Sequence, residues 1–170
     1  GIGRSSAPTP LWGVACLQVA SKVIEENRWP EGVICLLFGN RGAGEWMSND
    51  TRIPLVSATG STRMGKAVGA AVGARLGKSL LELGGNNAII ISKDADLDMS
   101  IIGAVFGAVG TCGQRCTSTR RLIIQEDVYD EVKNRLVKAY GQLNIGDPLN
   151  ETNHVGPLLD VDSVNQSLSS

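Results

Sequence analysis

A cysteine and a glutamate, each set in a glycine-rich segment, are the residues of this chain best suited to covalent chemistry. Glu82 precedes a diglycine in LLELGGNN at 80–87, and Cys116 lies in GTCGQRCTSTRR at 110–121. A cysteine thiolate attacks a carbonyl carbon, and the thioester that forms must then be hydrolysed by an activated water. A carboxylate can activate that water, and the chain has only one histidine, His154. These residues predict a nucleophile, Cys116, and a general base, Glu82.

The alternative interpretation of Glu82 is an ion-paired acid at the end of a strand. Leu81 and Leu83 flank it in an apolar run, where a carboxylate is costly to keep unless it has a role. The base role is therefore the favoured prediction.

The four cysteines do not form the pattern of a disulfide framework or of a metal site. Cys112 and Cys116 are too few for a tetrahedral metal site, which needs about four ligands, so no metal is expected. Cys16 and Cys35 lie in apolar runs and are predicted to be small, buried packing residues. All four cysteines are expected to be reduced.

A third segment, GSTRMG at 60–65, lies where a predicted strand passes into a predicted helix. Free backbone N–H groups and the positive end of the helix dipole can hold a phosphate at such a turn. Gly60 and Gly65 would permit close approach, and Ser61 could donate a hydrogen bond. An ordinary strand-to-helix turn is the alternative, and the turn alone does not decide between them.

The three segments together resemble the aldehyde dehydrogenase superfamily, because LELGG, GQRC and GSTRMG occur in that family's order and at similar spacing. The resemblance covers nearly the whole chain. The segments LLELGGNNAIII and FGAVGTCGQRCTSTRRL are most similar to the antiquitin-like branch, which oxidises α-aminoadipate semialdehyde. The resemblance implies NAD-dependent oxidation of an aldehyde, here an amino-acid-derived semialdehyde, to a carboxylate through a thioester on Cys116.

The resemblance also implies which residues bind the cofactor. Gly60, Ser61 and Gly65 would meet its pyrophosphate, and Gly84 in the diglycine would leave room for its nicotinamide end. Arg4 stands where the family has a lysine that holds the adenosine ribose. Because an arginine fork can also bind a 2′-phosphate, NADP is not excluded, and a surface arginine without such a role remains the alternative.

For the substrate, the resemblance points to Arg115. In antiquitin-like enzymes the arginine before the nucleophile helps to recognise the charged amino-acid end of the substrate. Other branches also carry arginine there, so the substrate assignment rests on the broader resemblance.

Alternating apolar strands and amphipathic helices predict an α/β fold with a parallel, doubly wound, Rossmann-like sheet. The resemblance implies that residues 1–82 are the later part of an NAD(P)-binding domain and residues 83–170 the first part of a catalytic domain. The expected helices are residues 11–27, 42–50, 94–110 and 127–143, and the expected strands are residues 33–39, 53–59, 80–83, 87–92 and 119–125. Residues 60–78 are expected to pass from a strand through a turn into a helix. Thr9 and Pro10 are the predicted start signals of the first helix, and Cys116 lies at a predicted corner between helix and strand.

Composition agrees with a soluble enzyme, and the lack of a signal-peptide pattern at the start favours a cytoplasmic location. The resemblance implies a small-molecule aldehyde as its substrate. Hydrophobic residues make up 42% of the 170, charged residues 19%, and the net charge of −1 does not predict a nucleic-acid-binding surface. No apolar run approaches the roughly 20 residues that span a bilayer. The resemblance implies a homo-oligomer for the complete enzyme.

The chain starts without methionine and ends in what resembles the opening of a helix, so an internal fragment is expected. Compared with the family, it lacks the upstream asparagine of the oxyanion hole and the downstream glutamate that holds the nicotinamide ribose. These 170 residues alone are therefore expected to be inactive. A noncatalytic nucleotide-binding or structural module that retains the fold is the alternative.

Overall fold

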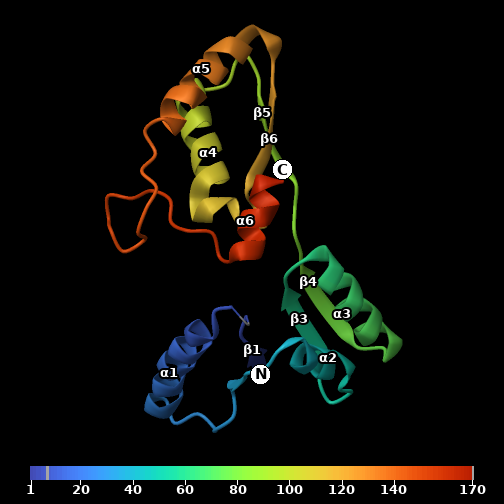
Figure 1. Ribbon diagram of the computed structural model, residues 1–170. Coiled ribbons are helices and arrows are strands. Elements are labelled where there is room, and N and C mark those ends of the chain that lie inside the picture. Colours follow the sequence, from blue (N-terminus) through green and yellow to red (C-terminus); the bar gives the residue numbers. More distant parts are fainter. Residues whose placement is uncertain (7, 170) are drawn as a thin grey trace. The chain divides into compact units, whose positions relative to one another are not determined.

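The computed structural model describes residues 1–6 and 8–169 and forms two compact units, Gly1–Glu82 and Leu83–Ser170 (Figure 1). Helices and strands alternate in both units. The first unit contains β1 (Ile2–Arg4), α1 (Pro10–Glu26), β2 (Cys35–Leu37), α2 (Arg41–Asn49), β3 (Leu55–Thr59), α3 (Thr62–Ala74) and β4 (Lys78–Glu82). The second contains β5 (Asn87–Ile91), α4 (Leu97–Val109), the 3₁₀ turn η1 (Gly110–Gly113), β6 (Thr119–Ile124), the 3₁₀ turn η2 (Glu126–Val128), α5 (Tyr129–Tyr140) and α6 (Val161–Leu168).

The strands pair in parallel, which confirms the α/β class. Each pair consists of two strands that a helix connects: β1 with β2 through α1, β3 with β4 through α3, and β5 with β6 through α4. A parallel pair needs a crossover of this kind, and a helix supplies it. The described strands form three two-stranded parallel sheets.

The link between β4 and β5 explains why the units separate there. Only residues 83–86 join these strands, which is far shorter than the crossover that parallel pairing requires. The assignment of the units to a cofactor-binding and a catalytic domain stays a prediction.

Local sequence signals start the helices. Thr9 and Pro10 occupy the cap and first positions of α1, as predicted. The side chain of Ser61 caps α3 by accepting a hydrogen bond from the Met64 N–H at 3.2 Å. Asp96 caps α4 in the same way through the Met99 N–H at 3.1 Å. Such caps satisfy backbone donors that the first turn of a helix leaves unpaired.

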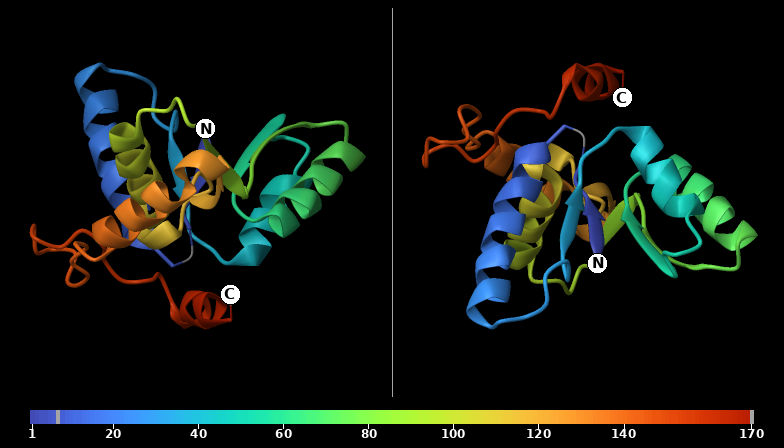
Figure 2. Two further views of the ribbon diagram at one scale, coloured as in Figure 1. Left: turned by 90° about the horizontal axis from the view of Figure 1, so that it is seen from above. Right: turned by 90° about the horizontal axis from the view of Figure 1, so that it is seen from below.

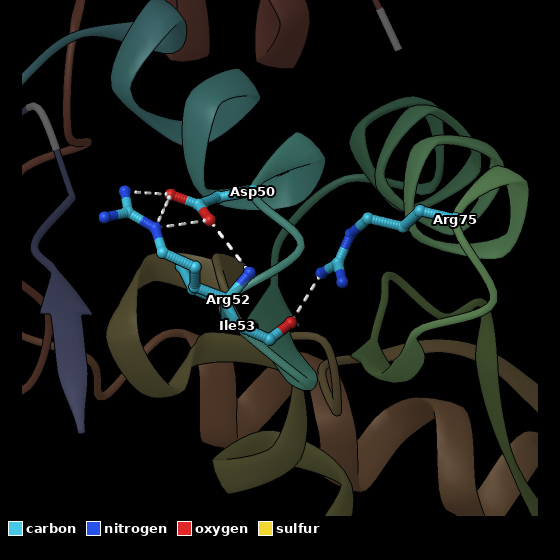
Figure 3. Close-up of polar contacts among 4 residues, drawn as sticks. All are labelled: Asp50, Arg52, Ile53 and Arg75. Carbon is cyan, nitrogen blue, oxygen red and sulfur yellow. Dashed lines mark hydrogen bonds and ion pairs between the residues drawn. The ribbon is translucent and has the colours of Figure 1, made fainter.

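Helix α3 packs against β3 and β4, with Val56 and Val72 buried. Arg75, directly after α3, holds the loop between α2 and β3: its Nη2 donates to the Ile53 carbonyl at 2.7 Å (Figure 3). In the same loop Asp50 and Arg52 form an ion pair of 2.6 Å. The hydrogen bond from the Arg52 side chain lowers the pKa of Asp50 to about 2.

The core of the second unit is aliphatic and joins β5, α4 and α5. Ile91, Ile101 and Val132 are its buried members. Helices α4 and α5 pack against each other, and Figure 2 shows them side by side. This packing anchors β5 and α4, and the candidate nucleophile lies in the segment that leads from α4 and η1 to β6.

Cys16 and Cys35 are exposed, so the prediction that they are buried packing residues is wrong. Cys16 belongs to α1, which has no buried residue and lies beside the short strands β1 and β2 (Figure 2). Two strands of three residues are too small to cover the apolar positions of a helix of 17 residues. In the part of the chain that the structure describes, no helix is long and apolar enough to cross a membrane.

Candidate active site

The predicted base and the predicted phosphate turn meet at the carboxyl ends of β3 and β4. Thr59 pairs with Glu82 in the strand register, and the Gly60 N–H donates to the Glu82 carbonyl at 3.0 Å. The Glu82 side chain is exposed and takes part in none of the ion pairs found within residues 1–6 and 8–169. Glu82 does end a strand, but no ion pair accounts for its charge there.

The turn after β3 has the features of an anion site at a helix N-terminus. The Ser61 hydroxyl accepts from Met64, and a hydroxyl that accepts one hydrogen bond can still donate its own hydrogen. No acidic residue lies in the first turn of α3, so no carboxylate of the helix itself opposes an anion there. A Cβ added at Gly60 would lie 2.6 Å from the Met64 Cε, and Gly65 is buried in the helix.

Arg4 lies on a different strand pair. It pairs with Leu37 across β1 and β2, and its Nε donates to the Gly39 carbonyl at 3.2 Å. The structure therefore holds Arg4 at the end of the β1–β2 pair, whereas Gly60 and Glu82 lie on β3 and β4. A role for Arg4 at the ribose stays a prediction.

Cys116 occupies the second position of a β-turn, Arg115–Ser118, between η1 and β6. The Ser118 N–H donates to the Arg115 carbonyl at 3.2 Å, and the Arg115 N–H donates to the Ser118 Oγ at 3.1 Å. Ser118 is only 2% exposed, so these bonds are shielded from water, whereas Cys116 is exposed. The turn thus presents a thiol on a fixed backbone at the predicted corner between helix and strand.

The backbone N–H of Cys116 points out of this turn. It shares a planar trans peptide with the Arg115 carbonyl, so the two groups point in opposite directions. Because the carbonyl is bonded inward to Ser118, the N–H faces outward, and it donates to no acceptor of the described residues. An outward N–H beside the thiol suits a developing oxyanion.

The carboxamide of Asn87 holds the far side of the same turn, a contact that the sequence did not indicate. Its Nδ2 donates to the Cys116 carbonyl at 2.7 Å and to the Ser118 carbonyl at 3.1 Å. Gly85 also lies close, since an added Cβ there would be 2.9 Å from the Cys116 carbonyl oxygen. At Gly84 an added Cβ would meet no atom within 4 Å, so this glycine leaves open space.

Left-handed backbone before the turn brings a distant segment close to it. Thr111 and Cys112 have φ of 54° and 57°. The partly buried Cys112 Sγ lies 3.2 Å from the Gly156 carbonyl, to which it donates. The Leu159 N–H also donates to the Gln114 Oε1 at 2.9 Å. These two bonds fasten residues 156–159 beside the nucleophile turn.

Arg115, the predicted substrate-recognition residue, is folded back onto the end of α4. Its guanidinium carbon lies 5.0 Å from the centre of the Phe106 ring, and its Nε donates to Thr111 Oγ1 at 3.0 Å. Gly110 makes room for it, because an added Cβ there would fall 1.5 Å from Arg115 Nη2. The residues that seat this guanidinium were not identified from the sequence.

The predicted site residues divide between the two units. Gly60, Ser61, Gly65 and Glu82 share the edge of the β3–β4 pair, and Arg4 lies on β1 in the same unit. In the other unit, Cys116 and Arg115 share one turn, and Gly84 belongs to the segment before β5. Within the described ranges, no three or more His, Cys, Asp and Glu side chains gather to hold a metal ion.

The sequence as a whole matches a family model. The model described as "Aldehyde dehydrogenase family" covers residues 2–169. The chain belongs to the aldehyde dehydrogenase family. Among curated members of this family, α-aminoadipic semialdehyde dehydrogenase from Bos taurus is 47% identical over 155 residues, which are 91% of this chain and 29% of that protein.

Solved aldehyde dehydrogenase structures share the fold. Glyceraldehyde-3-phosphate dehydrogenase from Methanocaldococcus jannaschii, solved with NADP, has a TM-score of 0.92 and 28% identity, over 99% of this chain and 37% of that one. Betaine aldehyde dehydrogenase from Staphylococcus aureus, solved with NAD⁺, has a TM-score of 0.89 and 27% identity, over 99% of this chain and 33% of that one. The chain thus spans about a third of the length of these relatives, which bind either nicotinamide cofactor.

Proposed function

We propose that the full-length protein is an NAD(P)-dependent aldehyde dehydrogenase that oxidises an amino-acid-derived semialdehyde to a carboxylate. The observation that carries this proposal is the nucleophile turn: it presents an exposed Cys116 thiol with its N–H directed outward, and the buried Ser118 holds its backbone. The 47% identity to the bovine semialdehyde dehydrogenase supports the substrate class.

Covalent chemistry begins at Cys116. Its thiolate sulfur forms a bond to the aldehyde carbon, and the carbonyl π electrons move to oxygen. The outward N–H of Cys116 then donates to that oxyanion, which lowers the barrier because the donor is already oriented. Collapse of the oxyanion expels hydride, with its electron pair, and leaves a thioester on the sulfur.

A bound nicotinamide cofactor supplies the acceptor for that hydride. The residues present fit such a group: the N-terminus of α3, Gly60 and the Ser61 hydroxyl suit its pyrophosphate, with no acid in the first helical turn. The open space at Gly84 suits its nicotinamide end. We further propose NAD as the principal cofactor, with NADP as an alternative, and a homo-oligomeric, cytoplasmic enzyme.

Hydrolysis completes the proposed cycle. Glu82 accepts a proton from water, the resulting hydroxide adds to the thioester carbon, and the sulfur leaves as thiolate with the electron pair of the S–C bond. The Glu82 carboxylate is exposed and forms no ion pair with any described residue, so it is available for this role.

The test uses the full-length protein and its Glu82→Gln variant. We expect the wild type to reduce NAD(P) in the presence of a semialdehyde, whereas Glu82→Gln forms the thioester on Cys116 and hydrolyses it about 10²- to 10⁴-fold more slowly. Mass spectrometry of rapidly quenched samples detects the acylated Cys116 peptide. Unchanged steady-state turnover in Glu82→Gln would contradict the base assignment. Cofactor binding without oxidation of any aldehyde would instead support the noncatalytic module.

A further inference from the structure

We propose that Asn87 is a positioning residue for the nucleophile: its carboxamide holds the Cys116 turn in the one orientation that directs thiol and N–H to the same carbonyl group. This inference rests on the proposed nucleophilic role of Cys116. It deepens that role by naming the side chain that fixes the backbone.

Asn87 uses both of its amide hydrogens on this turn. The Nδ2 atom bonds the Cys116 carbonyl at 2.7 Å and the Ser118 carbonyl at 3.1 Å. A carboxamide has two N–H donors, one for each carbonyl. The opposite amide orientation would place the Asn87 Oδ1 against two carbonyl oxygens, so the network itself determines which way the amide faces.

These two bonds complete the restraints on the peptide groups around Cys116. Ser118 already holds the Arg115 carbonyl, which orients the peptide that carries the Cys116 N–H. Asn87 holds the following peptide through the Cys116 carbonyl. With both flanking peptides fixed, the φ and ψ of Cys116 are fixed as well, and the Cα–Cβ bond that carries the thiol keeps a constant direction relative to the Cys116 N–H.

The position of Asn87 makes this restraint rigid. It is the first residue of β5 and pairs with Thr119 in β6, next to a register shift in the β5–β6 ladder. Farther along, Ile91 of the same strand is 1% exposed in the aliphatic core. The carboxamide therefore stands on a strand that is anchored in the core, whereas the turn that it holds is at the surface.

The test compares two electrophiles that react with Cys116, because only one of them depends on the orientation of the Cys116 N–H. p-Nitrophenyl acetate acylates a thiolate through a tetrahedral oxyanion, with formation of an S–C bond and departure of nitrophenolate. Iodoacetamide alkylates the same sulfur by displacing iodide, and no oxyanion forms. A misdirected N–H slows only the first reaction, whereas unfolding changes both.

In the full-length protein, Asn87→Ala is expected to slow acylation of Cys116 about 10²-fold, because a misplacement of about 1 Å costs on the order of 10²-fold and the loss of one oxyanion donor about 10²- to 10³-fold. Alkylation of Cys116 should change little. Asn87→Asp keeps the shape but opposes two carbonyl oxygens with a carboxylate, so it should slow acylation at least as much. Asn87→Ser retains one donor and should fall between Asn87→Ala and the wild type.

Asn86→Ala is the matched control. Asn86 is exposed, and the only bond that the structure gives it is to its backbone carbonyl, from Arg121 Nη2 at 2.6 Å, which alanine preserves. The ratio of the rate constant for acylation of Cys116 by p-nitrophenyl acetate to that for its alkylation by iodoacetamide should equal the wild-type ratio in Asn86→Ala. An unchanged ratio in Asn87→Ala would overturn the proposal, as would failure of Asn87→Ala, Asn87→Asp and Asn87→Ser to melt cooperatively when Asn86→Ala does.

The proposed function can fail separately from this inference. If the wild type oxidises no aldehyde but Cys116 is acylated, and Asn87→Ala alone lowers the ratio, the positioning role stands and the dehydrogenase assignment falls. If the wild type oxidises aldehydes and the acylation-to-alkylation ratio does not change in Asn87→Ala, the dehydrogenase assignment stands and the positioning role falls.

Discussion

Adding a single methyl group at Gly110 should displace the Arg115 guanidinium and change substrate preference without unfolding the protein. In Gly110→Ala the new Cβ would fall 1.5 Å from Arg115 Nη2 and 2.6 Å from its Cζ, so the guanidinium must leave. The backbone of Gly110 has φ −54° and ψ 129°, which alanine adopts without strain. The substitution therefore acts on Arg115 rather than on the chain path.

The effect on stability should be small. Displacement removes the contact with Phe106 at 5.0 Å, worth about 0.5–1 kcal/mol at a partly exposed site. It also breaks the hydrogen bond to Thr111 Oγ1, which is exposed, so water replaces it at little cost. Replacing glycine by alanine stabilises the folded protein by about 0.4–1 kcal/mol, because alanine restricts the conformations of the unfolded chain. Because these terms nearly cancel, the melting temperature should hardly move.

The effect on specificity should be large if Arg115 binds the charged end of the substrate. Loss of a charge-assisted hydrogen bond, about 1.5–3 kcal/mol, lowers kcat/KM for an acidic semialdehyde about 10- to 100-fold. The kcat/KM for a neutral aldehyde of similar length should stay the same. Steady-state assays of the full-length protein with both substrates measure the ratio of kcat/KM for the acidic semialdehyde to kcat/KM for the neutral aldehyde.

Gly103→Ala is the control, since an added Cβ at Gly103 in α4 meets no atom within 4 Å. It should leave the ratio of the two kcat/KM values unchanged and stabilise the helix by about 0.5–1 kcal/mol. An equal fall for both substrates in Gly110→Ala, or no fall for either, would refute the assignment of Arg115 to substrate recognition.

Two further predictions concern labelling and pH. Because Cys16 and Cys35 are exposed, iodoacetamide should modify them as well, but loss of activity should follow the modification of Cys116 alone when peptides are mapped by mass spectrometry; full activity with Cys116 blocked would contradict the mechanism. Asp50 has its pKa lowered to about 2 from an ordinary value of 3.8, so the stabilisation from its bond with Arg52 is present above about pH 4 and lost as the pH falls toward 2. Thermal melts between pH 6 and pH 2 should show this acid-dependent loss in the wild type but not in Asp50→Asn, and identical pH profiles would rule the contribution out.

Features determined by neighbouring residues were predictable from the sequence. The start of α1 follows from Thr9 and Pro10, and the placement of Cys116 between helix and strand follows from the glycine-rich segment around it. The parallel α/β class follows from the alternation of strands and helices, and the structure confirms it.

Features that depend on contacts between residues distant in the sequence were not predictable. Cys16 stands in an apolar run, but an apolar pattern does not show how much of a helix its neighbours cover. The Asn87 contact joins residues 29 and 31 positions apart, and one carboxamide carries no periodic signal. The seat of Arg115 on Phe106 depends on how the last turn of α4 meets η1, where two residues adopt left-handed backbone.

The hydrogen bond from the Gly60 N–H to the Glu82 carbonyl makes one amide hydrogen a reporter for the edge that carries the base and the phosphate turn. An amide exchanges with solvent deuterium when its hydrogen bond opens, at a rate set by the free energy of that opening. Separation of the carboxyl ends of β3 and β4 must break this bond. The exchange rate of the Gly60 amide therefore measures how firmly the two groups are held together, and an anion bound at the N-terminus of α3 should slow it.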